Sequence, residues 1–302
     1  CHPPGKPTLY GRLICQGVDS SGIPEITASE GFVVNEITKK SIHISCPKEN
    51  ASSKFLAPYT TFSRIHTKSI TCLDISSGGG LGVSTSTDGT MKIWQAANGE
   101  LRRVLEGHVF DVNCCRFFPS GLVVLSGGMD AQVKIWSAED ANCVVTFIGH
   151  KGGEREIGTE GKMLLLARED KKLQCVGLWS RQPVFLFVGS DAFNCCTFLS
   201  GFSLLAGTQD GNIYQLDVRN PRVPVQVIHR SGAPVLSLLA YRDGFAASQG
   251  DGTCFIMQQD LDYVIELTEA DCDPVYKVST WEKQIYTCCR DGVVRRYQLS
   301  DL

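Results

Sequence analysis

A histidine, a serine and an aspartate recur at one spacing in two stretches of the chain, and together these residue types could hydrolyse an ester or a peptide bond. The two sets are His66, Ser84 and Asp88, and then His108, Ser126 and Asp130, 42 residues further along. In a hydrolase of this kind the histidine takes the serine proton and the aspartate orients the histidine. Such catalysis needs one exposed nucleophile beside an oxyanion site. A set that is duplicated whole favours a structural role instead.

Each set ends in a tryptophan, which makes the pattern a repeat signature. Trp94 and Trp136 follow their aspartates by six residues. An aspartate-containing turn before an alternating strand recurs along the chain at intervals of 40 to 42 residues. These aspartates are Asp88, Asp130, Asp170, Asp210, Asp251 and Asp291. A period of this length is typical of the blades of a β-propeller.

Short strands must position these residues. Two strands are expected before each aspartate, for example at 70–75 and 82–86, and one more follows the tryptophan, for example at 102–105. The 30 glycines and the short alternating apolar runs favour strands and turns over helices. Such a sheet has two faces to cover, so the units must pack against one another around an axis.

These features resemble the WD40 repeat family over about residues 59–302. In that family the histidine, serine, aspartate and tryptophan of a blade form a buried hydrogen-bonded network. The resemblance therefore implies an all-β WD40 propeller held together by such networks. Their members here are His66, Ser84, Asp88, Trp94, His108, Ser126, Asp130 and Trp136. Later repeats keep only part of the set, as where Ala247 replaces the serine.

The ends of the repeat region suggest how the ring closes. The last unit stops after its third strand, at Leu299, while residues 59–65 match the fourth-strand position of an earlier unit. We therefore expect this N-terminal strand to complete the final blade of a propeller that spans 58–302, because closure removes exposed sheet edges. Residues 1–57 do not follow the repeat. They form either a small β domain of their own, which we favour, or a distorted extra blade.

One interval departs from the repeat. Residues 151–163 are polar where two apolar strands are expected, and His150 lies 20 rather than 22 residues before Asp170. Either this unit is degenerate, or the chain lacks residues near 153–154 that its family carries. We favour the second interpretation because the repeats on both sides are regular. The propeller would then have seven blades, of which six phased repeats are visible.

Composition limits the classes of partner and the cellular compartments that this chain fits. A net charge of −3 and a pI near 6.1 argue against nucleic acid as a partner. Several of the 14 cysteines are adjacent in the sequence, and adjacent side chains point to opposite faces of a strand. The sequence also contains no CxxC pair. We therefore expect reduced thiols and no metal site. No apolar run is long enough for a membrane helix, and the start does not resemble a signal peptide. We expect no cofactor, and a cytoplasmic or nuclear location.

Recognition by a propeller is expected on its narrower face. Each blade presents there the residue before the turn aspartate and two positions at the start of its first strand. The candidate partner-binding residues at or near these positions are Asp111, Asn113, Met129, Glu169, Asn194, Gln209, Leu236, Asp271, Asp273, Tyr276 and Arg290. The set is mildly acidic around an apolar centre, which suits a small helical partner that carries Lys and Arg.

Longer segments, such as residues 88–108 and 288–302, resemble WD40 chaperones that assist assembly of the 19S regulatory particle of the 26S proteasome. This resemblance runs over most of the chain, including its N-terminal segment. It implies a non-catalytic protein, monomeric on its own, whose propeller face binds the C-terminal domain of a proteasomal ATPase subunit of the 19S base. By occupying that domain, the protein would restrain association with the 20S core.

Two alternatives remain open at this stage. A WD40 substrate receptor or scaffold of a ubiquitin ligase, or of another multiprotein complex, would need several converging arginines to read a phosphopeptide, and the candidate set contains only Arg290. A propeller enzyme would need a poised nucleophile or a metal-ligand spacing, and the sequence shows neither.

Overall fold

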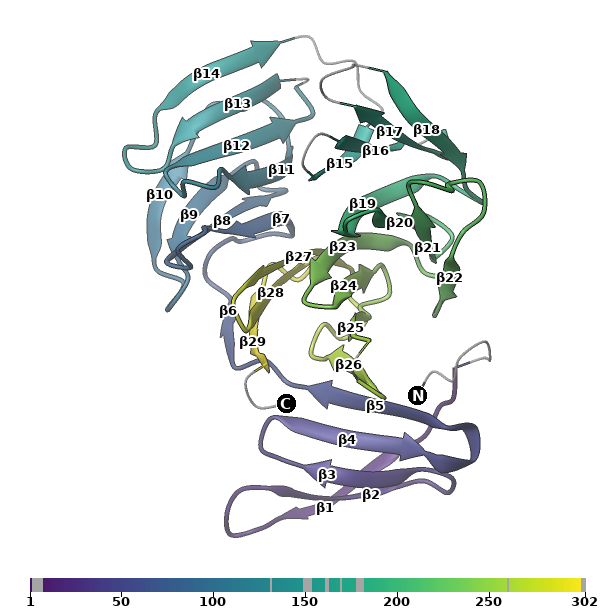
Figure 1. The fold of residues 1–302 in the computed structure, drawn as a ribbon. Coiled ribbons are helices and arrows are strands. Elements are labelled where there is room, and N and C mark those ends of the chain that lie inside the picture. The colour runs from purple at the N-terminus through teal and green to yellow at the C-terminus, as the bar shows by residue number, and fades with distance from the viewer. Residues whose placement is uncertain are drawn as a thin grey trace.

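The computed structural model describes residues 1, 8–130, 132–148, 154–160, 163–168, 170–177, 182–259 and 261–299. Apart from one short 3-10 helix, η1 (Pro47–Glu49), the secondary structure of these residues consists of β-strands (Figure 1). The fold is an all-β WD40 propeller, as expected from the repeat.

Five separate sheets have four strands each. The first comprises β7 (Ile70–Ile75), β8 (Leu81–Ser86), β9 (Met91–Gln95) and β10 (Leu101–Leu105). The second comprises β11 (Val112–Phe117), β12 (Val123–Gly128), β13 (Gln132–Ser137) and β14 (Cys143–Ile148). The third comprises β15 (Glu154–Glu160), β16 (Met163–Arg168), β17 (Lys172–Gly177) and β18 (Pro183–Val188). The fourth comprises β19 (Phe193–Ser200), β20 (Ser203–Thr208), β21 (Asn212–Asp217) and β22 (Gln226–His229).

The fifth four-stranded sheet joins the two ends of the repeat region. It comprises β27 (Val275–Trp281), β28 (Gln284–Cys289), β29 (Val294–Gln298) and the N-terminal β6 (Thr60–Phe62). Val294 of β29 pairs antiparallel with Phe62 of β6. A strand from the start of the repeat region thus hydrogen-bonds to the last strand of the chain.

The N-terminal segment extends a blade sheet. Four strands, β23 (Val235–Tyr241), β24 (Gly244–Gln249), β25 (Cys254–Met257) and β26 (Val264–Leu267), have the order of a blade. They continue into β5 (Ala51–Leu56), β4 (Ser41–Cys46) and β3 (Val33–Ile37), which makes a sheet of seven strands. β5 runs parallel to β26, and β1 (Leu13–Val18) and β2 (Pro24–Ala28) form a separate hairpin. The division of the chain into two domains at residue 57 stays a prediction.

Local sequence explains why the strands stop where the aspartates stand. Four of these aspartates precede a glycine, and Gly89, Gly211, Gly252 and Gly292 all have a positive φ, between 77° and 88°. Glycine reaches this region without the steric cost that a Cβ imposes, so Asp-Gly is a favoured hairpin turn. The second strand therefore reverses into the third at the same place in each of these units.

The hydrophobic core lies between sheets. The innermost strands pack in the order β11, β7, β27, β23, β19 and β15, each against the next (Figure 1). Five clusters of buried apolar side chains fill the five junctions between these consecutive sheets. Each blade is therefore stabilised by apolar area that it buries on a neighbour.

The prediction of seven blades is not confirmed by this architecture. The polar interval at 151–163 does contain the strand β15, and β15 to β18 form a four-stranded sheet in the unit of Asp170. Residues 151–153, 161 and 162 lie outside the described residues.

Candidate functional site

The candidate site lies at one end of the blades, which we call the Asp-turn face. It consists of the turns between second and third strands and the loops that lead into first strands. Because neighbouring strands are antiparallel, these segments share one end of each sheet. The turns and loops at the opposite end, such as 96–100 and 118–122, form the opposite face.

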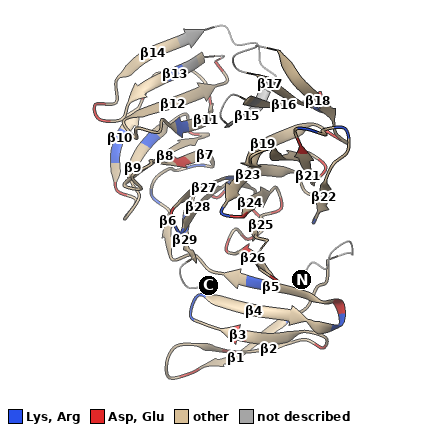
Figure 2. Ribbon diagram, viewed as in Figure 1, with Lys and Arg blue, Asp and Glu red and all other residues tan. Residues whose placement is uncertain are grey.

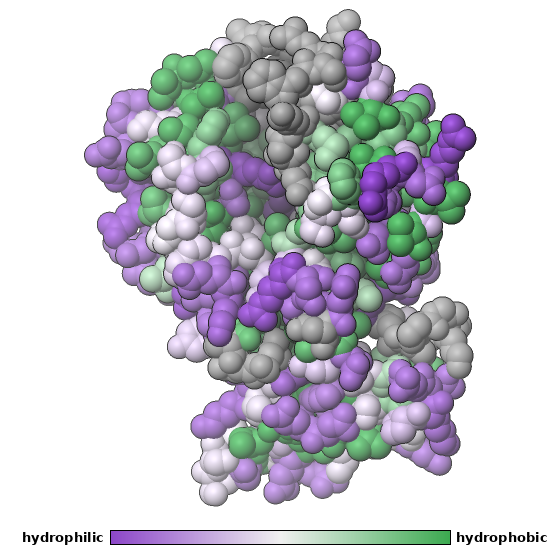
Figure 3. Space-filling model, viewed as in Figure 1, coloured by the Kyte–Doolittle hydropathy of each residue, from purple (hydrophilic) through white to green (hydrophobic). Residues whose placement is uncertain are grey.

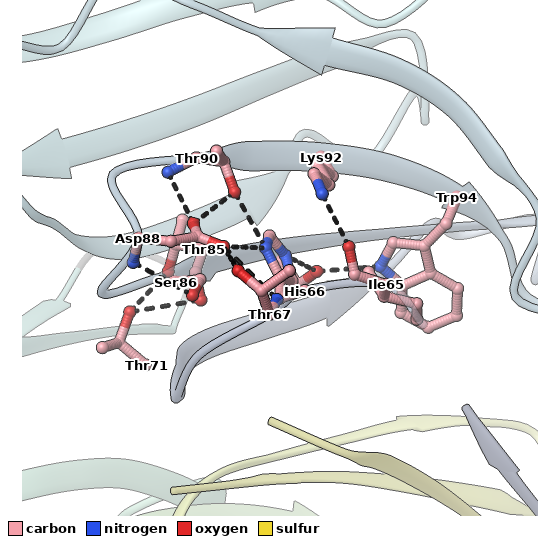
Figure 4. Close-up of polar contacts among 11 residues, drawn as sticks. Ile65, His66, Thr67, Thr71, Thr85, Ser86, Asp88, Thr90, Lys92 and Trp94 are labelled. Atoms are coloured by element: carbon pink, nitrogen blue, oxygen red, sulfur yellow. Dashed lines mark hydrogen bonds and ion pairs between the residues drawn. The ribbon is translucent and has the colours of Figure 1, made fainter. Parts of the chain in front are cut away.

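Beneath the Asp-turn face, the first His-Ser-Asp-Trp set makes one connected network (Figure 4). Ser84 Oγ accepts a hydrogen bond from Trp94 Nε1 at 3.0 Å and lies 2.8 Å from His66 Nε2. His66 Nδ1 is 2.9 Å from the Thr90 hydroxyl and 3.8 Å from Asp88 Oδ2. Thr90 in turn donates its hydroxyl and its backbone N–H to Asp88. The threonine thus bridges histidine and aspartate.

Burial and hydrogen bonding together set the charge states in this network. Burial lowers the pKa of His66 from 6.5 to about 4, despite the nearby carboxylate of Asp88. Burial also opposes ionisation of Asp88, but hydrogen bonds from Thr90 outweigh it and lower the pKa of this carboxyl to about 2. At neutral pH the pair therefore holds a neutral imidazole beside a carboxylate.

The second set has a direct histidine–aspartate contact. His108 Nδ1 lies 2.9 Å from Asp130 Oδ2, and its Nε2 lies 2.7 Å from Ser126 Oγ. Trp136 Nε1 donates to the same serine at 2.8 Å. Gln132 occupies the position of Thr90 and contributes only its backbone N–H to Asp130.

Neither set has the exposed nucleophile that a catalytic triad needs. Ser84 and Ser126 are both 0% exposed, and each hydroxyl is already engaged by a tryptophan and a histidine. A substrate carbonyl would have to reach the serine hydroxyl, which is buried in both sets. What the networks can do is satisfy polar groups at the base of the Asp-turn face.

The predicted partner-binding residues lie in the turns, loops and first-strand starts of the Asp-turn face, except Glu169, which lies outside the described residues. Two pairs of them are in contact. Asn194 Nδ2 donates to Gln209 Oε1 at 3.0 Å, and Arg290 donates to Asp273 at 2.6 to 2.9 Å. The guanidinium therefore neutralises one of the acidic residues on which the expected acidic rim depends.

The remaining predicted residues differ in how far they reach solvent. Asn113, Met129 and Asp271 are exposed, whereas Asp111, Leu236 and Tyr276 are half-buried. Asp191, next to the predicted set, lies 3.7 Å from Lys171. Acidic and basic residues are also interspersed along the chain in Figure 2. The acidic character of this face is thus weaker than the sequence suggested.

The sequence analysis predicted Met129 on this face but missed two exposed apolar residues near it, Val109 and Phe110. Val109, Phe110 and Met129 are 74%, 62% and 67% exposed. Their segments are held together, because the backbone N–H of Met129 donates to Asp111 O at 2.9 Å and that of Val109 donates to Asp130 Oδ2 at 3.2 Å. We call these three side chains the VFM patch.

The neighbouring blade shows that the fold does not require apolar residues there. At the 42-residue offset, Thr67, Lys68 and Thr87 occupy the positions of the VFM patch. All three are exposed as well. The same backbone thus carries polar side chains in one blade and large apolar ones in the next. Comparing the two repeats position by position would have revealed the patch from sequence alone.

The described part of the chain shows no metal-ligand cluster, no membrane-spanning helix and no disulfide. It contains no group of three or more His, Cys, Asp or Glu side chains arranged to hold a metal ion. None of its helices is long and apolar enough to cross a membrane. The fourteen cysteines, all of them described, form no disulfide.

The fold and the buried networks define a WD40-repeat protein. Residues 57–95 and 99–137 match the family described as WD domain, G-beta repeat. Three vertebrate proteins named proteasomal ATPase-associated factor 1 align with the whole chain and with 94% of their own lengths. Those of Bos taurus and Homo sapiens are 73% identical to it, and that of Gallus gallus is 70% identical. The chain belongs to the proteasomal ATPase-associated factor 1 family of WD40-repeat proteins.

The alignments also show that these relatives carry additional residues. The match to the Bos taurus protein extends over 368 positions, whereas this chain has 302 residues. At least 66 aligned positions therefore have no counterpart here. This excess is longer than one repeat of 40 to 42 residues.

Proposed function

We propose that this chain is a non-catalytic chaperone for assembly of the 19S regulatory particle of the proteasome. In this proposal the Asp-turn face binds the C-terminal domain of a proteasomal ATPase subunit. While bound, the chain would block whatever else docks on that domain and so restrain association with the 20S core. The name of the vertebrate relatives, proteasomal ATPase-associated factor 1, supports association with proteasomal ATPases.

The VFM patch is the observation that carries the proposal. Large apolar side chains that stay exposed and pre-positioned by backbone hydrogen bonds are typical anchors of a protein interface. Asp111 follows Phe110 directly, and the backbone carbonyl of Asp111 accepts from Met129 N. An apolar anchor with an adjacent carboxylate fits a helical surface that presents Leu or Met beside Lys or Arg.

A ligase receptor that reads phosphopeptides is less well supported. Arg290, the arginine of the predicted set, already donates to Asp273. Phosphate recognition relies on arginines whose donors are available to the ligand. We further propose that the protein is a monomer without its partner and acts in the cytoplasm, with the nucleus as a second compartment.

The patch can be tested with residues that the neighbouring blade already uses. The triple variant V109T, F110K, M129T replaces each residue of the VFM patch with the residue at the same position of the first blade. Those residues are Thr67, Lys68 and Thr87. We expect it to bind the isolated C-terminal domains of proteasomal ATPases at least about tenfold more weakly, because interface anchors are worth ~2 kcal/mol or more. Isothermal titration calorimetry with each of these domains measures the change.

The control lies at the other end of the same blade. Leu122 is 67% exposed in the turn between β11 and β12, on the opposite face. Leu122→Lys should leave binding unchanged. Equal affinity of the triple variant and the unmodified chain for every ATPase domain would refute the VFM patch as the interface. Binding of ligase subunits in place of these domains would favour the scaffold alternative.

A further inference from the structure

Three exposed valines lie along the outermost strand of the fourth sheet, β22, and the segment that leads into it. Val223, Val225 and Val227 are 65%, 65% and 47% exposed, and we call them the valine strip. β22 ends its sheet, so no strand in the described part of the chain pairs with its outer edge. Figure 3 shows hydrophobic side chains beside strongly hydrophilic ones at the right, where β22 lies in Figure 1. An edge strand offers backbone N–H and C=O groups to a further strand.

The next sheet shows how this protein covers such an edge. Its outermost blade strand is β26, and the N-terminal β5 pairs with β26 in parallel. Just after β26, the backbone N–H of Thr268 donates to Leu56 O of β5 at 3.0 Å. The outer edge of a blade therefore accepts an added strand through backbone hydrogen bonds.

The strand registers give the equivalent positions of β22 and β26. Ile213 pairs with Ile228 in the fourth sheet, and Cys254, 41 residues after Ile213, pairs with Leu267 in the next sheet. The equivalent residues that follow from these registers are Val225 and Val264, Gln226 and Ile265, Val227 and Glu266, Ile228 and Leu267, and His229 and Thr268.

Exposure at these positions differs between the two strands. Val227 is 47% exposed, whereas Glu266 is 9% exposed. Gln226 is exposed, whereas Ile265 is fully buried. By the same register, the backbone N–H of His229 points away from β21, as that of its equivalent in the next sheet points toward β5. β22 thus has the form of β26 without its added strand.

Charge around the valine strip indicates the chemistry of a partner. Residues 218–235 include three arginines and one histidine and no acidic residue. Arg219 and Arg230 form ion pairs within the chain, which leaves the exposed Arg222 without an ion pair in the described ranges. A basic edge lined with valines suits an extended segment in which apolar and acidic side chains alternate.

The fold does not require such an edge. The outer strand of the first sheet, β10, instead carries exposed Arg102 and Arg103. Charged side chains on an edge strand discourage the addition of another strand. The valines of the fourth sheet are therefore a property of this blade, and β10 supplies a matched control.

We propose that the outer edge of β22 is a docking site for an extended acidic segment of a partner protein, which adds to the fourth sheet as β5 adds to β26. Its valines contact the valine strip and its carboxylates face Arg222. The site lies on the outer strand of its sheet, apart from the VFM patch, so this inference is independent of the proposed ATPase interface.

The probe is a fluorescein-labelled peptide of alternating valine and glutamate, whose binding is measured by fluorescence anisotropy. A peptide of alternating valine and lysine should bind at least about tenfold more weakly. Arg222→Glu should weaken binding of the acidic peptide at least about fivefold, because it reverses the charge beside the strip. Arg102→Glu makes the same change on β10 and should leave binding unchanged.

A second pair of variants tests whether the peptide adds as a strand. His229→Pro removes the backbone N–H at the edge and should abolish binding. His229→Ala removes only the imidazole and should bind within about twofold of the unmodified chain, because the edge N–H remains. Equal loss of binding in both variants would contradict strand addition.

Hydrogen exchange of the unmodified chain tests the site even if His229→Pro fails to fold. At saturating acidic peptide, the amides of Val227 and His229 should exchange at least about tenfold more slowly. Peptide binding without this protection would refute the site. Protection of these amides in the free chain that increases with protein concentration would identify a second copy as the occupant. Adsorption to phosphatidylserine vesicles without binding of the peptide would assign the strip to a membrane surface, which also overturns the proposal.

Discussion

His108 Nδ1 lies 2.9 Å from Asp130 Oδ2, whereas the corresponding pair in the preceding blade, His66 and Asp88, is separated by 3.8 Å. The difference follows from one residue, because the first blade places the Thr90 hydroxyl between histidine and aspartate. The same four-residue network thus tolerates a direct and a bridged form. Its role is to position the Asp-turn face from below.

Removal of the Asp88 carboxylate should destabilise the fold without changing recognition. Asp88→Ala leaves the Thr67 and Thr90 donors without their acceptor. We expect a loss of about 1 to 3 kcal/mol in the free energy of unfolding, measured by urea denaturation. The exposed Glu100→Ala is the control, and partner binding by the folded fraction should be unaffected. Unchanged stability of Asp88→Ala would show that the network does not stabilise the fold.

Stability should fall between neutral pH and pH 5 because of His66. Its pKa is near 6.5 in the unfolded chain and about 4 in the fold, so the unfolded state binds more protons in this range. The contribution is complete above pH 6.5 and decreases as the pH falls toward 4, by on the order of 2 kcal/mol at pH 5. His66→Asn should reduce this pH dependence. An equally steep pH profile in that variant would contradict the assignment to His66.

Asp88 acts in the same direction at lower pH. Its pKa is near 3.8 when unfolded and about 2 when folded, so its contribution is present above pH 3.8 and is lost as the pH falls through 2. The two groups together predict a steady loss of stability on acidification. Chemical denaturation at half-unit pH intervals would resolve the two ranges.

Charge reversal on the Asp-turn face tests electrostatic recognition separately from the VFM patch. The double variant D111K, D273K should weaken binding to the proposed ATPase domain strongly and leave less salt dependence. Asp273→Lys also releases Arg290 from its ion pair. Reversal of Glu139 and Asp140, which lie exposed on the opposite face, is the control. Full binding by D111K, D273K would exclude an electrostatic role for this part of the face.

A buried ion pair stabilises the sheet that receives the N-terminal strands. The Arg230 side chain is 4% exposed, donates to Glu266 and lies 4.1 Å above the ring of Phe255. Glu266→Ala should cost about 3 to 5 kcal/mol in unfolding free energy, because it removes the carboxylate to which the buried guanidinium donates. The double variant R230M, E266L should recover most of that loss. An equal Tm for Glu266→Ala and for R230M, E266L would show that the unpaired charge does not destabilise Glu266→Ala.

The sequence by itself determined the all-β class, the repeat period and the membership of the buried networks. These features depend on short-range chemistry: Asp-Gly turns, alternation along a strand, and a histidine, a serine and a tryptophan at set distances from an aspartate. The resemblance to the WD40 family implied the pairing of Ser84 with Trp94, which the structure shows. A comparison of the two repeats also shows that Val109 and Phe110 replace Thr67 and Lys68.

Only the tertiary structure decided which surfaces are covered and which charges are paired. Arg290 and Asp273 lie 17 residues apart, and β5 and β26 meet across about 210 residues. Cys72 is buried and Cys114 is exposed, although both cysteines lie at the same position of their repeats. A local pattern fixes which face of a strand a residue occupies, but burial of that face depends on what packs against it.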